Sequence, residues 1–178
     1  MRRGRGLAGS LLLVLVLGLL LFSDRGDRLG GQDRSPAPQT AGGEGSSLRA
    51  YVSRVIDGDT IEVRIGGGSD DVRYIGIDTP ETVKPGTPVQ CFGPQAHDFN
   101  QRLVANHSVR LVFDRERRDV YGRLLAYVWL GDRMVNAELA RRGYARTLTI
   151  APNVAHAGLF HRLASAAGRA GRGLWGVC

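Results

Sequence analysis

Short apolar runs separated by turn residues dominate the chain from residue 48 onward. The runs are rich in β-branched and aromatic residues, and their length of about four to eight residues is typical of β-strands. Two of the breaks contain the turn chemistry of hairpins, with Asp-Gly-Asp at residues 57–59 and a glycine-rich segment at residues 66–71. The pattern predicts five strands, at residues 49–56, 60–65, 72–77, 109–113 and 124–130.

Three other segments repeat apolar residues at helical spacing. The first starts at Pro94, which the first turn of a helix tolerates, and stops before Asn106. The second begins near Asn136, a good N-cap residue, and ends at Gly143, the usual residue after a helix C-terminus. A third helix is predicted at about residues 153–170.

The predicted order of elements is three strands, one helix, two strands and two helices. This order indicates the α+β class, mainly β with helices, and within it a five-stranded OB-fold barrel with three helices. Periodicity alone also fits an α+β sandwich built from the same elements. The chemical motifs must therefore decide between the two architectures.

The N-terminal segment has the layout of an export signal. In residues 1–23, arginines precede an apolar run at residues 11–22 that is short for a bilayer-spanning helix of about 20 residues. A cleaved signal peptide fits this layout, and an uncleaved signal anchor stays open because no Ala-x-Ala site follows. Residues 24–47 contain too few apolar residues to order themselves and are predicted to form a disordered linker. We expect a domain at residues 48–178 that is secreted or extracytoplasmic, with membrane contact only through an uncleaved N-terminal segment.

The chain is basic, with a formal net charge of +7 over 178 residues. Subtracting the three arginines before residue 6 leaves +4, so much of the positive charge belongs to the rest of the chain. An anionic partner such as nucleic acid is consistent with this charge. Lys84 is the single lysine, and the arginine guanidinium suits phosphate oxygens well, although a codon bias toward arginine explains the composition equally well.

Cys91 and Cys178 are the two cysteines of the sequence. In a reducing cytosol they would be free thiols. After export they are candidates for a disulfide that links the C-terminal end to the loop before the first predicted helix. A zinc site is disfavoured because it generally needs about four ligands, and the sequence has no CxxC or HxxxH spacing.

Acidic residues occupy turns and strand ends. Asp59 lies in the tight turn between the first two predicted strands, and Asp78 follows the third. Because calcium prefers carboxylate, carbonyl and water oxygens, Asp59, Asp78 and the Thr79 carbonyl would form a three-point calcium site if these strand ends converge. The alternative is ordinary turn usage, since Asp-Gly and Asp-Thr-Pro are common at strand ends.

Arg73, Glu81 and Arg123 carry the groups that phosphodiester hydrolysis needs. Two guanidinium groups together with a cation can stabilise the negative charge that develops on the phosphate. Glu81 would hold or deprotonate the attacking water if it lies within reach of it. The alternative is that both arginines form ordinary surface ion pairs.

Five segments in one order resemble the landmarks of the staphylococcal nuclease, or thermonuclease, family. They are VIDGDT (55–60), RYIGIDTPET (73–82), YGRLLAY (121–127), MVNAELARRG (134–143) and GLW (173–175). The resemblance covers about residues 50–176. Several separate motifs in the right order are far more specific than any one of them, and the fold that they imply is again the OB barrel.

The resemblance implies a calcium-dependent phosphodiesterase that hydrolyses DNA and RNA, with water attacking in line on phosphorus and leaving 3′-phosphate ends. By position it implies calcium ligands at Asp59, Asp78 and Thr79, outer-shell support at Asp57, and catalytic residues at Arg73, Glu81 and Arg123. The implied partners are DNA and RNA substrates, and we expect a monomer.

The substrate pocket departs from the family pattern. Val120 replaces a lysine beside the Tyr121 counterpart, and residues 147–152 lack two tyrosines. Because stacking on an aromatic ring contributes about 1 to 3 kcal/mol per base, we expect weaker substrate binding or a different base preference. Tyr121 remains a candidate phosphate or sugar contact, and Lys84 lies in a loop that could cover the substrate.

The alternative function is a non-catalytic OB-fold module that binds nucleic acid or another protein. Glu81 disfavours this alternative, because a carboxylate facing the substrate phosphate would repel it without helping simple binding. A third hypothesis, a membrane-tethered interaction protein, predicts no dependence on metal at all.

Overall fold

The computed structural model describes residues 45–83 and 85–178, so the predicted export signal and most of the predicted linker lie outside the described residues. In the described part, β1 (Ser47–Asp57), β2 (Thr60–Ile65) and β3 (Gly68–Tyr74) form an antiparallel meander. The two turns that join these strands are those expected from the Asp-Gly-Asp and glycine-rich segments.

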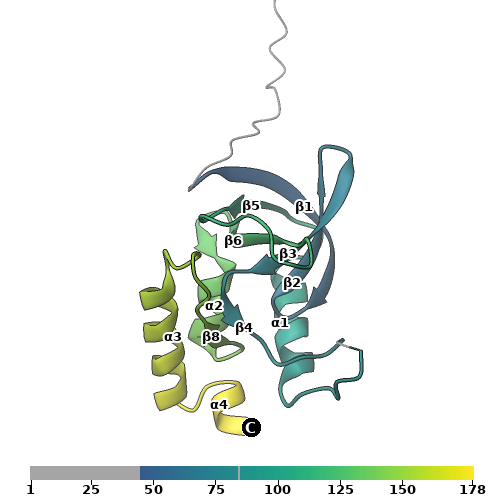
Figure 1. Cartoon of the computed structure of the whole chain (residues 1–178). Helices are drawn as coiled ribbons and strands as arrows, with labels where there is room; N and C mark the ends of the chain where they lie inside the picture. Colours follow the sequence, from purple (N-terminus) through teal and green to yellow (C-terminus); the bar gives the residue numbers. More distant parts are fainter. Residues whose placement is uncertain (1–44, 84) are drawn as a thin grey trace, which may run out of the picture. The chain divides into compact units, whose positions relative to one another are not determined.

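Two further strands close the barrel. β5 (Ser108–Val112) pairs with β1, and β6 (Leu124–Leu130) pairs with β5 on one side and, in parallel, with β3 on the other. The parallel pairing, in which Val72 lies opposite Leu124, closes the sheet on itself (Figure 1). A short strand, β7 (Arg133–Met134), extends the sheet beyond β6. The predicted α+β class and five-stranded OB-fold barrel are confirmed.

The barrel interior is filled by alternate residues of its strands, as the pleat requires. The strand side chains without solvent exposure include Val52, Ile61, Val63, Val72, Leu111 and Val128. The same cluster includes Val104 from α1 (Gly93–Val104) and Leu139 from α2 (Val135–Arg142). Because full burial of such a side chain contributes about 1.5 to 3 kcal/mol, this shared core supplies most of the stabilisation of the fold.

The predicted third strand, residues 72–77, is divided in the structure. After β3, the short strand β4 (Gly76–Asp78) leaves the barrel and pairs with β8 (Arg146–Leu148) in a separate two-stranded sheet. The break falls at Ile75, and the next residue, Gly76, has a φ of 83°, which favours glycine. A Cβ atom at this position would overlap the ring of Phe160, so the bend depends on a residue far along the chain.

Asn136 is not an N-cap, contrary to the prediction. α2 begins at Val135, and Asn136 is buried within the helix. Its Oδ1 accepts the backbone N–H of Val128 at 2.9 Å, and its Nδ2 donates to the carbonyl of Ile75 at 2.9 Å. The side chain therefore fixes the helix to β6 and to the bend between β3 and β4.

The C-terminal helix α3 (Ala157–Arg169) starts later than residue 153, the predicted start. Asn153 instead lies in a turn bridged to Ile150, and a second short helix, α4 (Leu174–Val177), follows α3. The sequence pattern did not predict α4 or the short strands β4, β7 and β8. Within the part of the chain that the structure describes, no helix combines the length and the apolar composition needed to cross a bilayer.

A disulfide joins Cys91 to Cys178, with 6.0 Å between their Cα atoms. Cys91 lies just before α1, and Cys178 follows α4. The bond therefore holds the C-terminal residue against the loop that leads from β4 to α1. By the chain-entropy estimate, a cross-link over a separation of 87 residues stabilises the folded state by about 4 to 5 kcal/mol.

Candidate active site

The turn between β1 and β2 fixes the position of Asp59. The Oδ1 atom of Asp57 accepts the backbone N–H of Asp59 at 3.0 Å, which closes the turn. Asp59 is buried, and its Oδ2 accepts the backbone N–H of Thr79 at 2.6 Å. A Cβ atom on Gly58 would lie 2.6 Å from the Thr79 hydroxyl oxygen, so only glycine allows this approach. The turn and the end of β4 are thus locked together.

Arg73 joins the two aspartates that the sequence singles out. Its Nη1 lies 3.1 Å from Oδ2 of Asp59, and its Nη2 donates to Oδ1 of Asp78 at 2.7 Å. The same guanidinium donates to the carbonyls of Tyr74 and Ile77 at 3.1 and 2.9 Å, so its position is fixed by the bend after β3. The carboxylates of Asp59 and Asp78 therefore face one cation, on one side of the barrel.

The environment of Asp59 disfavours its ionised form. The pKa of the Asp59 carboxyl is raised to about 7, mainly by burial and to a smaller extent by the negative charges of Asp57 and Asp78, while Arg73 and the Thr79 N–H oppose the increase. A second cation beside these carboxylates would offset the cost of their burial. The oxygens available there, from Asp59, Asp78 and backbone carbonyls, are those that calcium prefers.

No group of three or more His, Cys, Asp or Glu side chains with metal-binding geometry occurs within residues 45–83 and 85–178. The donor set at Asp59 and Asp78 thus consists of two carboxylates supplemented by backbone oxygen. This composition leaves most positions of a calcium ion, which takes about six to eight oxygen ligands, to water and substrate.

Replacing Asp59 with asparagine is expected to stabilise the metal-free protein at pH 8, by an amount on the order of 1 to 4 kcal/mol. The folded-state pKa of about 7 lies above the usual 3.8, so the folded state binds the extra proton between these values and the parent loses stability as the pH rises through that range. Urea unfolding in chelator, at pH values from about 4 to 8, measures this effect. An Asp59→Asn protein that is less stable than the parent at pH 8 would contradict it.

A cavity of about 330 Å³ lies beside the two aspartates and contains both predicted catalytic arginines. Arg73, Tyr121 and Arg123 contribute to its lining, which also includes Glu116, Asp119, Val120, Leu148, Ile150 and Asn153. Val120 and Tyr121 are exposed by 93% and 81%, so they form an open apolar rim. The cavity is therefore lined by two arginines and has an apolar edge on its open side.

Arg123 forms an ion pair with Asp119 rather than with a carboxylate of the Asp59 cluster. Its Nε donates to Oδ2 of Asp119 at 2.8 Å, and its Nη2 lies 2.7 Å from the same oxygen. The guanidinium also lies over the ring of Tyr121, 5.4 Å from the ring centroid. Asp119 thus holds Arg123 at the cavity wall, a role that the sequence analysis missed.

Glu81 does not line this cavity. It lies in the loop after Thr79, where its Oε1 accepts the backbone N–H groups of Thr82 and Val83 at 2.9 Å. Its own N–H donates to Oε1 of Gln90 at 3.0 Å, which ties the start of the loop to its end. Lys84, the other predicted contact of this loop, lies outside the described residues.

Two further polar residues missed from the sequence fix the loops around the cavity. Asn153 accepts the N–H of Glu116 and donates to its carbonyl, both at 2.8 Å. Asp114 is buried and accepts the Tyr127 hydroxyl at 2.9 Å and the N–H of Ala155 at 3.0 Å. Asp114 directly follows a buried strand end, which is a usable sequence signal, but nothing in the sequence identifies its partners.

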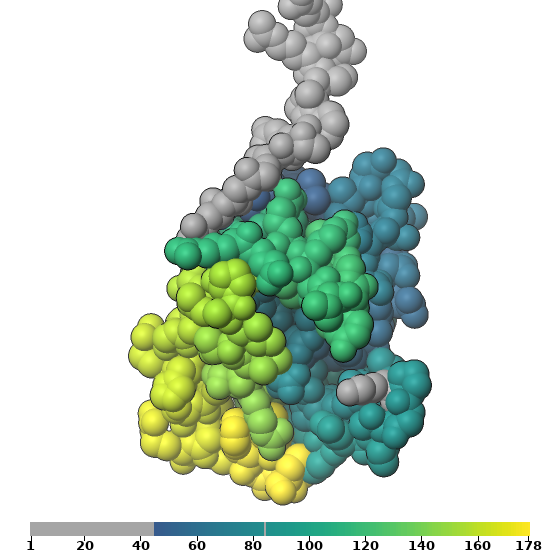
Figure 2. Space-filling model, in the orientation of Figure 1, coloured from purple at the N-terminus to yellow at the C-terminus, as the bar shows by residue number. Residues whose placement is uncertain are grey.

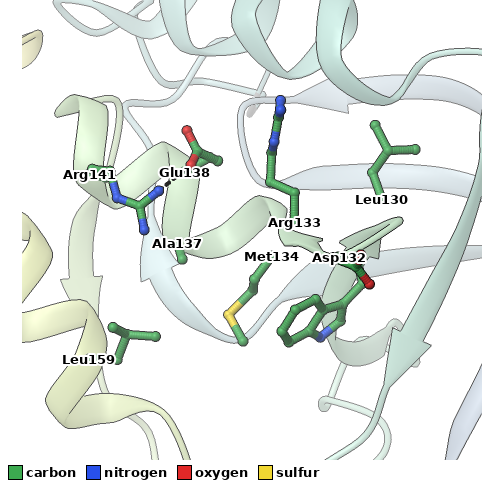
Figure 3. A pocket seen from close by; sticks show the side chains of 9 residues that line it. Leu130, Asp132, Arg133, Met134, Ala137, Glu138, Arg141 and Leu159 are labelled. Carbon is green, nitrogen blue, oxygen red and sulfur yellow. Dashed lines mark hydrogen bonds and ion pairs between the residues drawn. The ribbon is translucent and has the colours of Figure 1, made fainter.

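A larger and more open hollow of about 660 Å³ is formed by the β6–β7 turn, α2 and α3 (Figure 3). None of the predicted site residues lines it. Among its charged side chains, Glu138 is held by ion pairs to Arg141 and Arg142. The hollow has carboxylates and guanidinium groups of its own, at Asp132, Glu138, Arg133 and Arg141, but none of them belongs to the motifs that the sequence singles out.

Comparison with known proteins identifies relatives of this chain. The family model described as "Staphylococcal nuclease homologue" matches residues 71–177. The chain is 56% identical over 102 residues to "Thermonuclease" of Staphylococcus intermedius and 51% identical over 116 residues to "Thermonuclease" of Staphylococcus hyicus. These matches cover 57% and 65% of this chain, and 61% and 69% of the two relatives. "Endonuclease YncB" of Bacillus subtilis (strain 168) is 46% identical over 100 residues, or 56% of this chain and 47% of that protein.

Proposed function

The chain belongs to the staphylococcal nuclease family, and from this premise we propose that it is a calcium-dependent phosphodiesterase that hydrolyses DNA and RNA. The names of its relatives, thermonuclease and endonuclease, support a nuclease. The observation that carries the proposal is the contact of Arg73 with both Asp59 and Asp78, at the edge of a cavity that also contains Arg123.

Asp59, Asp78 and the Thr79 carbonyl would hold the calcium ion, with Asp57 as outer-shell support. The short contact between Oδ2 of Asp59 and the Thr79 N–H supports this assignment, because it brings both residues to one point. Asp57 supports Asp59 through the hydrogen bond within the turn. When bound, calcium would neutralise negative charge on the phosphate of the substrate.

The catalytic roles follow from the chemistry of phosphodiester hydrolysis. Glu81 accepts a proton from the water that attacks phosphorus in line with the departing 5′ oxygen. Arg73 and Arg123 donate hydrogen bonds to the phosphate oxygens as their negative charge increases. The P–O5′ bond breaks, the 5′ oxygen takes up a proton, and the product ends in a 3′-phosphate.

Substrate binding beside the phosphate is proposed to involve Tyr121 and the loop that contains Lys84. Val120 and Ile150, which are exposed at the cavity, would contact a base or sugar without offering an aromatic face, so Tyr121 is left as the exposed aromatic ring of the lining. Stacking is therefore weaker than in a pocket with further tyrosines, and the binding of substrate relies more on its phosphates.

We also propose that the protein is exported. The layout of residues 1–23 supports export, and the disulfide between Cys91 and Cys178 is of a kind that persists outside the reducing cytosol. Extracellular calcium concentrations would then be available to a site with few protein ligands.

Incubation of the full chain with plasmid DNA or with RNA tests the proposed activity. We expect cleavage of both with calcium and a rate at least about 100-fold lower with a chelator, because loss of the cation removes charge stabilisation from the transition state. Analysis of product ends should find 3′-phosphates. Cleavage that is unchanged by the chelator would disprove calcium dependence, and failure to cleave either polymer would disprove the nuclease function.

A further inference from the structure

Positive charge is concentrated in the last forty residues of the chain. Residues 139–178 contain six arginines and neither aspartate nor glutamate, whereas residues 45–138 contain 12 Lys and Arg against 13 Asp and Glu. The barrel is therefore close to neutral, and the positive charge of the folded part comes from the segment that includes β8, α3 and α4. Figure 2 shows this C-terminal segment, in light green to yellow, at the surface of the molecule.

Part of this charge lines an open hollow of about 530 Å³ between β8, α3 and α4. Its lining consists of Arg146, Thr147, His161, Ala164, Ser165, Gly168, Arg169 and Trp175. The polar side chains of this set are hydrogen-bond donors or hydroxyls, and the set contains no carboxylate. We call Arg146, His161, Arg169 and Trp175 the C-terminal basic face.

The two arginines of the C-terminal basic face are available to a ligand. Arg146 and Arg169 are both exposed, and neither forms an ion pair with any residue among 45–83 and 85–178. Arg141 and Arg142, on the neighbouring helix α2, are by contrast both paired with Glu138. An unpaired guanidinium beside another is electrostatically unfavourable unless an anion binds between them.

Trp175 holds Arg146 in place. The Arg146 guanidinium lies over the Trp175 ring, 5.2 Å from its centroid, and the ring packs against Gly168 of α3. Trp175 remains 39% exposed. Because a stacked guanidinium loses less conformational freedom when it binds an anion, this arrangement prepares Arg146 for a phosphate.

The C-terminal basic face is continuous with the candidate active site. In the ladder between β4 and β8, Arg146 lies directly opposite Asp78, so an arginine of the basic face and a proposed calcium ligand are neighbours on paired strands. Directly opposite residues of an antiparallel pair project to the same face of the sheet. Figure 1 shows β8 lying between β4 and α3.

We propose that the C-terminal basic face binds the phosphates of a nucleic acid strand a few nucleotides away from the phosphate that is cleaved. This proposal rests on the proposed nuclease function and adds a second contact region to it. The face binds the polymer backbone through Arg146 and Arg169, without reading the bases. It therefore raises affinity for long strands and leaves the hydrolysis of a single-nucleotide ester unchanged.

The test compares two double variants of the full chain that lose the same charge. Arg146→Ala/Arg169→Ala removes the proposed contacts. Arg49→Ala/Arg64→Ala is the matched control, because both of its arginines are exposed and Arg64 likewise lies over an aromatic ring, 4.9 Å from the Tyr51 centroid. Thermal melts check that both variants fold like the parent.

Affinity for a labelled single-stranded DNA is measured in EDTA, at several salt concentrations, so that no cleavage occurs. Each phosphate contact on a single strand contributes about 0.7 to the slope of log K against log salt. Loss of two contacts should lower this slope by about 1.4 and weaken binding about 10- to 30-fold at about 0.1 M salt. The control variant should bind within about twofold of the parent, since its charges lie away from the strand.

The second measurement is hydrolysis of a p-nitrophenyl ester of thymidine phosphate with calcium, where both variants should match the parent. Equal weakening of DNA binding in both variants would overturn the proposal, because net charge alone would then explain it. Binding to anionic phospholipid vesicles that is lost in Arg146→Ala/Arg169→Ala while DNA binding is kept would also overturn it. If the parent binds DNA through this face but hydrolyses neither the ester nor the polymer, the proposed nuclease function is disproved and the proposed binding face is supported.

Discussion

Replacing Glu81 with glutamine is expected to lower the turnover number on DNA by about 100- to 10,000-fold, the contribution typical of a general base. Glutamine preserves the size of the side chain and can still accept the N–H groups of Thr82 and Val83, but it takes no proton from water at neutral pH. Steady-state cleavage of plasmid with saturating calcium measures the loss. The Michaelis constant should change much less than the turnover number, because the phosphate contacts remain.

Glu62→Gln is the matched control for this variant. Glu62 lies on β2, where its carboxylate is held by Ser53 and Arg54, away from the proposed catalytic groups. Its replacement removes the same charge and should leave cleavage within about twofold of the parent. Turnover by Glu81→Gln at the rate of Glu62→Gln would show that Glu81 is not the base.

Replacing Gly76 with alanine is expected to lower the free energy of unfolding by about 3 kcal/mol or more. Two costs add at this position: a positive φ costs an alanine about 1 to 2 kcal/mol, and the new Cβ collides with the ring of Phe160, where overpacking costs about 1 to 3 kcal/mol. Because Gly76 separates Arg73 from Asp78, the strain also falls on the bend that brings these side chains together. Urea or guanidinium unfolding measures the stability.

Gly131→Ala separates the two costs. Gly131 has a φ of 58°, and a Cβ atom there would meet no other atom within 4 Å. This variant should therefore lose only the backbone contribution of about 1 to 2 kcal/mol. If the two alanine variants are destabilised equally, the Phe160 ring moves aside at no cost in stability. The bend then does not depend on Phe160.

The strands of the barrel were predictable because local sequence determines them. Burial alternates along β5 and part of β1, β6 is a continuous apolar run, and the turns between β1, β2 and β3 contain their own glycine and aspartate signals. The division at Gly76 was not predictable, since an isolated glycine within a strand pattern has several meanings and Phe160 lies far along the chain. Asparagine is a common N-cap residue, but the buried hydrogen-bond partners of Asn136 on β6 and at Ile75 place it inside the helix.

In the candidate site, too, the features set by local sequence were predictable and those set by distant contacts were not. Asp59, Asp78 and Thr79 were predicted as calcium ligands from short motifs at strand ends; the structure brings the three residues together through Arg73 and the Thr79 N–H, and their role as ligands stays a prediction. Asp119 was missed as the partner of Arg123, because an acidic residue four positions away in an irregular loop has no fixed geometry in sequence. Which groups line a cavity depends on how two loops meet, and periodicity contains no information on that.

The disulfide joins two regions that we propose to act on different parts of a substrate. One end, Cys91, closes the loop that begins at Glu81, whose carbonyl accepts the N–H of Gln90. The other end, Cys178, follows the helix that supplies Trp175, the support of Arg146. A reductant that opens this bond would free the Glu81 loop and the helix with Trp175 at the same time. We therefore expect reducing conditions to lower both the cleavage rate and the affinity for long strands.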